Sequence, residues 1–83
     1  MDEFVVYVLY SSSTNKTYVG YTTDLINRML SHNVFDKKGY TRKFRPWIVI
    51  HVEFYETKSM AMKRELELKT GKGRDFIRKQ LLA

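Results

Sequence analysis

The first part of the chain alternates between short apolar runs and polar segments in a way that predicts a β-hairpin followed by a helix. Residues 4–10 (FVVYVLY) are all β-branched, aromatic or aliphatic, which is typical of a strand buried on both faces. Residues 11–16 have the composition of a turn, and residues 17–21 (TYVGY) predict a second, antiparallel strand. The polar residues 22–24 can cap a helix with apolar positions at helical spacing, which we expect to end near Asn33.

The middle of the chain predicts an irregular connection and then a third strand. Residues 34–46 show no hydrophobic period and carry many basic side chains. Residues 47–55 (WIVIHVEFY) are again rich in β-branched and aromatic residues, as strands are. Pro46 stands just before this run, where its missing N–H interrupts no pairing.

Two helices are expected to complete the chain. Thr57 or Ser59 could cap the first, which runs to about residue 70 before the glycines at 71 and 73 interrupt it. The second covers residues 74–82. The order is therefore ββαβαα, which predicts an α+β fold: a three-stranded, largely antiparallel sheet flanked by helices, in a single domain spanning residues 1–83.

Composition narrows the class of protein. The chain has 83 residues, of which 43% are hydrophobic, and it contains no cysteine. The absence of cysteine excludes a disulfide scaffold, a zinc finger and a thiol nucleophile, and it fits a reducing compartment. The longest apolar run, residues 4–10, is too short to span a membrane and lacks the basic start of a signal peptide. We therefore expect a cytoplasmic protein that does not bind a membrane.

The net charge of +6 is concentrated in the second part of the chain. Residues 1–34 hold two basic and three acidic side chains, whereas residues 35–83 hold thirteen basic and six acidic ones. One stretch interleaves basic residues with aromatic ones, which is typical of a surface that follows phosphates and stacks on bases, although a solvated loop explains it equally well. Its basic residues are Lys37, Lys38, Arg42, Lys43 and Arg45.

Several side chains on the hairpin and the first helix are candidates for chemistry. Arg28 and His32 are four residues apart, so they lie on one side of the predicted helix, with His32 next to Leu25 at the edge of the apolar face. A solvated arginine and a histidine that caps the helix are the structural alternative. Tyr7 and Tyr18 lie near each other if the hairpin loop is short, and packing across the strands would account for both.

The helix after the third strand carries one candidate carboxylate. Glu65 projects close to the direction of the apolar Ala61, at the edge of the core-facing side. A carboxylate in such a place pairs with a cation or binds a metal, because an unpaired buried charge is costly. Lys69, four residues on, is the ordinary helical partner, so the residues alone leave both alternatives open.

Taken in order, these residues resemble the motifs of the GIY-YIG endonucleases over about residues 4–77. The segments Val6-Tyr7-Val8 and Tyr18-Val19-Gly20 are similar to the two tripeptides that name the family. Arg28 matches the helix arginine of the family and His32 the histidine four residues later. The run AMKRE, residues 61–65, matches the helix that bears the single metal-binding glutamate, here Glu65. The likeness is greatest to small stand-alone members related to the N-terminal nuclease domain of the bacterial excision-repair enzyme.

The resemblance implies a phosphodiesterase that uses one divalent ion, Mg²⁺ or Mn²⁺, with Glu65 as its only protein ligand. Arg28 would stabilise the negative charge that develops on the phosphate. Tyr7 or Tyr18 would position or deprotonate the attacking water, and His32 is the other candidate proton acceptor or phosphate contact. The chain departs from members that carry lysine directly after the second tripeptide, because Tyr21 stands there.

From these features we expect an endonuclease that acts on nucleic acid, DNA rather than RNA, in the repair or processing of branched or damaged structures. The alternative is a module of the same fold that binds nucleic acid but does not cleave it, or that cleaves only with a recruiting protein partner. In either case, the predicted nucleic-acid contacts are Lys37, Lys38, Arg42, Lys43, Arg45 and Lys69.

Overall fold

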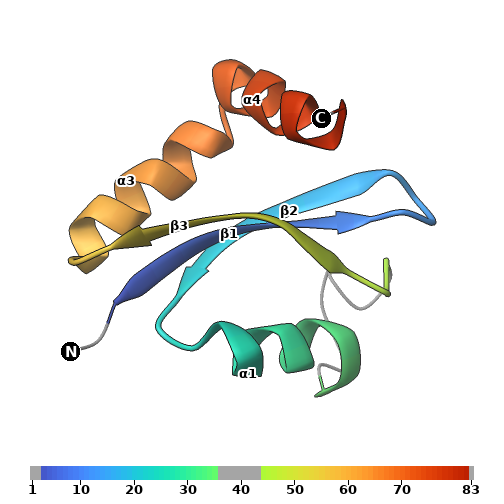
Figure 1. The fold of residues 1–83 in the computed structure, drawn as a ribbon, viewed down its shortest axis with the longest axis horizontal. Helices are drawn as coiled ribbons and strands as arrows, with labels where there is room; N and C mark the ends of the chain where they lie inside the picture. Colours follow the sequence, from blue (N-terminus) through green and yellow to red (C-terminus); the bar gives the residue numbers. More distant parts are fainter. Residues whose placement is uncertain (1–2, 36–43, 83) are drawn as a thin grey trace.

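The structure is a computed structural model that describes residues 3–35 and 44–82. A three-stranded antiparallel sheet has the spatial order β2-β1-β3, with α1 on one face and α3 and α4 on the other (Figure 1). This arrangement confirms the predicted α+β fold and its ββαβαα order. The elements are β1 (Phe4–Ser11), β2 (Lys16–Thr22), α1 (Leu25–Leu30), the π-helical turn η1 (Ser31–Phe35), β3 (Ile48–Tyr55), α3 (Lys58–Leu68) and α4 (Gly71–Leu82).

The register of the hairpin decides which side chains of β1 and β2 meet. Tyr7 pairs with Gly20 and Leu9 pairs with Tyr18, so the two tyrosines are diagonal neighbours on one face of the sheet. Their ring centroids are 6.4 Å apart. Asn15 closes the hairpin loop with a φ of 56°, in the left-handed region that asparagine tolerates better than most residues.

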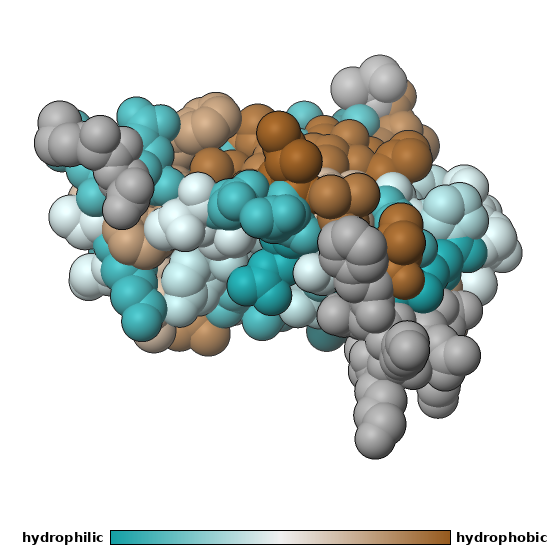
Figure 2. Space-filling view, turned by 90° about the horizontal axis from the view of Figure 1, so that it is seen from below, coloured by the Kyte–Doolittle hydropathy of each residue, from teal (hydrophilic) through white to brown (hydrophobic). Residues whose placement is uncertain are grey.

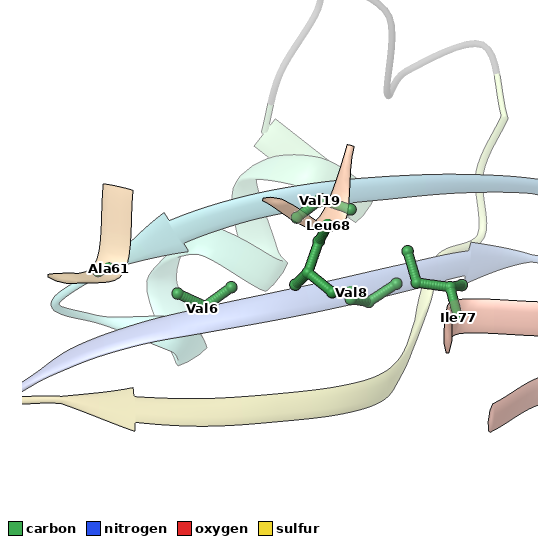
Figure 3. Packing of buried hydrophobic residues seen from close by; sticks show 6 residues of the cluster. All are labelled: Val6, Val8, Val19, Ala61, Leu68 and Ile77. Carbon is green, nitrogen blue, oxygen red and sulfur yellow. The ribbon is translucent and has the colours of Figure 1, made fainter. Parts of the chain in front are cut away.

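Each face of the sheet has its own core, because β1 is the central strand and its side chains alternate between the two faces. On the α1 face, Tyr7, Leu9 and Trp47 are buried together and pack against Leu25 and Met29. On the opposite face, the buried apolar side chains interlock between the sheet and the two C-terminal helices (Figure 3). These are Val6, Val8, Val19, Ala61, Leu68 and Ile77.

Polar side chains fix the first turns of α1 and α3. Asp24 caps α1, because its carboxylate accepts a hydrogen bond of 3.1 Å from the backbone N–H of Asn27. Of the two predicted caps for α3, Thr57 is the one used: its hydroxyl oxygen accepts from the N–H of Met60 at 3.2 Å. The predicted capping of both helices is therefore confirmed, and it sets where each helix begins beside the sheet.

The predicted start of the last helix and the predicted end of the first helix are wrong. The last helix begins at Gly71 rather than at residue 74, and Gly73 lies inside it. A Cβ at Gly73 would collide with the backbone of Glu67 and Leu68, so this glycine allows α4 to pack against the end of α3 rather than breaking a helix. The first helix does not continue regularly to Asn33, because its hydrogen bonding changes to a π-helical turn at Ser31.

Side-chain hydrogen bonds tie the segment before β3 to the end of η1. β3 starts one residue later than predicted, and Trp47 instead forms two bonds with the side chain of Asn33. Its N–H donates to Asn33 Oδ1 at 2.7 Å, and its carbonyl accepts from Nδ2 at 3.1 Å. Trp47 is only 2% exposed, so these two hydrogen bonds hold the buried indole in the core between the sheet and α1.

Apolar side chains also remain on the surface, and they gather along one side of the α1 face of the molecule (Figure 2). Exposed examples are Ile26 and Leu30 of α1 and Val52 and Phe54 of β3. Because β3 is an edge strand, its side chains are covered less completely than those of β1. No helix within the described residues is long and apolar enough to cross a membrane.

Candidate active site

A cavity of about 440 Å³ opens beside the edge strand β2, and residues of the strands, of α1 and of α3 line it. The strands supply Tyr7 and Tyr18, α1 supplies Arg28, and α3 supplies Lys58 and Glu65. The structure thus brings four of the five predicted catalytic residues to one cavity. The fifth, His32, is not among the lining residues of the cavity, but it contacts both Tyr7 and Tyr18.

The Tyr7 hydroxyl lies 3.0 Å from Nε2 of His32, and both side chains are buried, at 1% and 4% exposure. Burial raises the pKa of Tyr7 above its usual value; the neighbouring Tyr18 raises it further, and the positive charge of Arg28 opposes the shift. The phenol is therefore protonated at neutral pH. With its proton on Nδ1, His32 accepts the Tyr7 proton in a hydrogen bond.

The edge of Tyr18 completes this aromatic group. Its ring centroid is 4.9 Å from that of His32, in an edge-on arrangement. The Trp47 ring centroid is 6.3 Å from that of Tyr18, also in an edge-on arrangement, so Tyr18 packs against Tyr7, His32 and Trp47. Both tyrosines line the cavity, but Tyr18 is half-buried, whereas Tyr7 is only 1% exposed. The two tyrosines of the motif therefore differ in access to water, a distinction that the sequence did not reveal.

Gly20 provides the space that the Tyr7 ring occupies. A Cβ placed on Gly20 would lie 2.6 Å from the Tyr7 hydroxyl oxygen and 2.8 Å from the ring carbon that bears it. Real Cβ atoms do not approach so closely, so any larger residue would displace the phenol. The glycine of the second tripeptide is thus explained by the path of Tyr7 towards His32.

The π-helical turn and Arg45 fix the backbone position of His32. His32 lies in η1, and the Arg45 guanidinium donates hydrogen bonds to the backbone carbonyls of His32 and Ser31, the second at 3.3 Å. Those carbonyls belong to a helix end, where intrahelical donors are missing. Arg45, predicted to contact nucleic acid, therefore has a positioning role in the structure.

Glu65 forms the helical ion pair with Lys69 that was one of the two alternatives left open by the sequence, and it also lines the cavity. Its side chain is 19% exposed, it lines the cavity, and its Oε1 lies 3.5 Å from the ammonium of Lys69. In the described part of the chain, no three His, Cys, Asp or Glu side chains gather in a way that could hold a metal. A single carboxylate with room for waters fits Mg²⁺, which keeps much of its hydration shell and takes phosphate oxygens as ligands. The predicted metal is thus compatible with this donor.

Lys58 is a cavity residue that sequence reasoning missed. It lies seven residues before Glu65, which is close to two helical turns, so the two side chains share one side of α3. That spacing could have identified it once Glu65 was singled out. Four predicted nucleic-acid contacts lie outside the described residues: Lys37, Lys38, Arg42 and Lys43.

The chain is similar to known proteins over almost its whole length. Residues 3–79 match the GIY-YIG catalytic domain. A UPF0213 protein of Staphylococcus haemolyticus is 37% identical over 82 residues, covering 99% of this chain and 93% of the relative. A UPF0213 protein of Staphylococcus aureus is 41% identical over 70 residues, 84% of each chain.

A solved structure supports the same relationship. The solution NMR structure of a UPF0213 protein from Bacillus halodurans superposes with a TM-score of 0.56 at 26% sequence identity, covering 93% of this chain and 83% of the other. The paired tyrosines, the helix arginine and the α3 glutamate stand around one cavity in the fold described above. By sequence, fold and match to the domain, the chain belongs to the GIY-YIG family of nuclease domains, whose substrates are nucleic acids.

Proposed function

We propose that this protein is a divalent-metal-dependent endonuclease that hydrolyses phosphodiester bonds in DNA. The observation that carries the proposal is the cavity beside β2, which collects the two motif tyrosines, Tyr21, two cations and one carboxylate from the strands and two helices of the fold. This combination suits phosphodiester hydrolysis, which needs a proton acceptor, positive charge around the phosphate and a hard-metal ligand. The sequence separation of these residues makes a purely local packing role a poor explanation for all of them together.

Tyr7 and His32 are proposed to activate the attacking water. Because burial keeps the Tyr7 phenol protonated, its oxygen can take a proton from water only as it gives its own proton to another group. Nε2 of His32, 3.0 Å away, is that group, so the two protons move together. The resulting hydroxide forms a bond to phosphorus, and the bond to the leaving 3′ oxygen breaks. His32 then carries the proton as an imidazolium. Tyr18, which is more accessible, would orient the water or the adjacent sugar.

Arg28 and Lys58 are proposed to bind the phosphate. Both line the cavity, and their charges counter the negative charge that grows on the non-bridging oxygens during attack. Tyr21, which stands where other family members carry lysine, lines the same cavity, so Lys58 can supply the ammonium group that this position lacks. Glu65 would hold Mg²⁺ or Mn²⁺, whose chemistry when bound is to stabilise the charge on the leaving oxygen.

The choice of DNA, and of branched or damaged DNA in particular, rests on the resemblance to the excision-repair nuclease domain. A cytoplasmic enzyme of this size is proposed to act on its own or through a recruiting protein. Cleavage of supercoiled, branched and single-stranded DNA should therefore be measured in parallel, with RNA of the same sequence as a comparison. Preference for a branched substrate would support a role in processing.

The decisive variant is Glu65→Gln, which keeps the shape of the side chain and removes its charge. In Mg²⁺ or Mn²⁺ the wild type should form product, and EDTA or Glu65→Gln should reduce product to background. Glu67→Gln is the matched control, because Glu67 is on the same helix but is exposed and outside the active-site cavity. Cleavage that persists in EDTA or in Glu65→Gln would contradict the metal role.

The contact between Lys69 and Glu65 favours one second candidate, a module that binds nucleic acid without cleaving it. At 3.5 Å, the ammonium of Lys69 competes with a metal ion for the same carboxylate. Salt-sensitive binding without product under all metal conditions would support this alternative. Lys69→Gln separates the two, because a nuclease inhibited by this pair should then gain activity in low Mg²⁺.

A further inference from the structure

Two more cavities continue from the candidate active site towards the C-terminal helix. The first, about 220 Å³, shares Tyr18 with the active-site cavity and is also lined by Lys69 and Arg74. The second, about 630 Å³, shares Arg74 with the first and adds Arg78. Because each cavity shares lining residues with the next, the three lie one after another along the path from the active site to α4. We call the part beyond the active site, lined by Lys69, Arg74, Ile77 and Arg78, the β2–α4 groove.

The charged residues along this path are mostly basic, although Lys69 is paired with Glu65 at 3.5 Å. The path from the active-site cavity through the groove is lined by five cations, Arg28, Lys58, Lys69, Arg74 and Arg78, and Glu65 is the single acidic residue among the described lining residues. Asp75 lies 3.8 Å from Arg78, but both side chains are about two-thirds exposed, so this ion pair is weak in water. A row of cations of this kind attracts a polymer with regularly spaced negative charges.

The geometry of α4 shows that the groove cations are not simply part of a uniformly basic helix. Arg74 and Arg78 are four residues apart, on the side of α4 whose Ile77 is buried in the core. Lys72 and Lys79 lie on the opposite side, and Lys72 lines a separate cavity with Arg64 and Phe76. α4 thus has two basic stripes of equal charge, and only one borders the path from the active site.

We propose that the β2–α4 groove binds the sugar-phosphate backbone of the DNA strand that flanks the cleaved phosphodiester. This inference rests on the proposed function, because it takes the active-site cavity as the start of the path. Lys69, Arg74 and Arg78 contact successive phosphates, and the exposed Leu81, which lines the second cavity, faces the sugars. Binding here does not depend on base identity, so the groove adds affinity and direction without adding sequence specificity.

The test compares two double variants with the same net charge: Arg74→Gln/Arg78→Gln in the groove and Lys72→Gln/Lys79→Gln on the opposite stripe. Binding of fluorescein-labelled single-stranded DNA is measured by anisotropy at several salt concentrations in EDTA, so that no cleavage occurs. Loss of two phosphate contacts should reduce the slope of log K against log[salt] by about 1.4 and weaken binding about 25-fold at 0.1 M salt. The Lys72→Gln/Lys79→Gln variant should keep the wild-type slope.

Equal slopes for the two double variants, or no binding by the wild type, would overturn the groove. The proposed function is judged separately, from product formation by the wild type in Mg²⁺. Binding that depends on the groove, without any product, would contradict the proposed nuclease activity but support the groove. Product formation with equal slopes would contradict the groove alone. Arg78 is 70% exposed, so the single variant Arg78→Gln, with a slope change of about 0.7, serves if the double variant is unfolded.

Discussion

The hydroxyl of Tyr7 and the imidazole of His32 are hydrogen-bonded at 3.0 Å, although 25 residues separate them in the chain. The contact needs an empty position at Gly20 on one side and the Arg45 guanidinium on the carbonyl of His32 on the other. Four segments of the sequence therefore converge on one hydrogen bond. Substitutions in different segments can therefore test the same hydrogen bond.

Tyr7→Phe should remove the proposed proton relay and leave the ring in place. We expect kcat to fall about 10²–10⁴-fold and the free energy of unfolding to fall by about 1 kcal/mol. Tyr55→Phe is the control, because its hydroxyl bonds to Glu53, away from the cavity, so it should lose stability but not cleavage rate. Wild-type kcat in Tyr7→Phe would show that the hydroxyl acts only in packing.

Gly20→Ala should displace Tyr7, because a Cβ there meets both the oxygen and the adjoining ring carbon at under 3 Å. We expect a loss of about 1–3 kcal/mol in the free energy of unfolding together with reduced cleavage. Gly71→Ala is the matched control, since nothing lies within 4 Å of a Cβ at that position. Urea denaturation of both variants checks the prediction, and equal stability of the two would contradict it.

Lys58→Gln should weaken phosphate binding in the cavity. With one of two cations removed, we expect kcat/KM to fall about 10–10²-fold. Lys63→Gln removes an equal charge from an exposed position on the same helix and should leave kcat/KM unchanged. If the two variants cleave equally well, Lys58 does not contact the substrate.

The stability of the protein in acid should depend on Glu53, which lies on the face of the sheet that α3 and α4 cover. Burial by itself would raise the pKa of Glu53, yet hydrogen bonds donated by Arg64, His51 and Tyr55 hold the pKa at about 2, below the ordinary 4.5. Since the folded state favours the charged carboxylate, the stabilisation is complete above pH 4.5 and is lost as the pH falls towards 2.

Glu53→Gln should therefore lower the free energy of unfolding at neutral pH by about 1–3 kcal/mol and flatten its decline in acid. Glu56→Gln, at an exposed position just after β3, should keep the wild-type profile. Denaturant unfolding across the acidic range is the measurement. Parallel pH profiles for the wild type and Glu53→Gln would show that other carboxyl groups govern the acid transition.

The pattern of residues was sufficient to predict the type and order of the secondary-structure elements. A run such as residues 4–10 is apolar at every position, and a central strand covered on both faces requires that composition. Asp24 and Thr57 could be recognised as caps because a cap bonds to an amide only three residues away. Interactions as local as these are encoded in neighbouring positions, so they can be recognised without knowing the fold.

The candidate site was only partly accessible from sequence. Motif resemblance selected Tyr7 and Glu65, but spacing by itself left core packing and a helical ion pair as full explanations. Lys58 was missed because helical periodicity shows which residues share a face, not which face borders a cavity. The role of Arg45 was equally hidden, since the carbonyls that it contacts belong to a segment 13 and 14 residues away.

The tertiary structure decided the features that depend on contacts between distant segments. Gly73 lies inside a helix because α3 and α4 approach too closely for any side chain there, and nothing local distinguishes that case from a helix break. Likewise, the register that sets Tyr7 across from Gly20 comes from pairing two strands, and the bond to His32 comes from packing α1 and η1 on one face of the sheet. The sequence by itself determined which elements form, because their causes lie within a few residues. Which side chains meet in the cavity was left to the packing of the elements against one another.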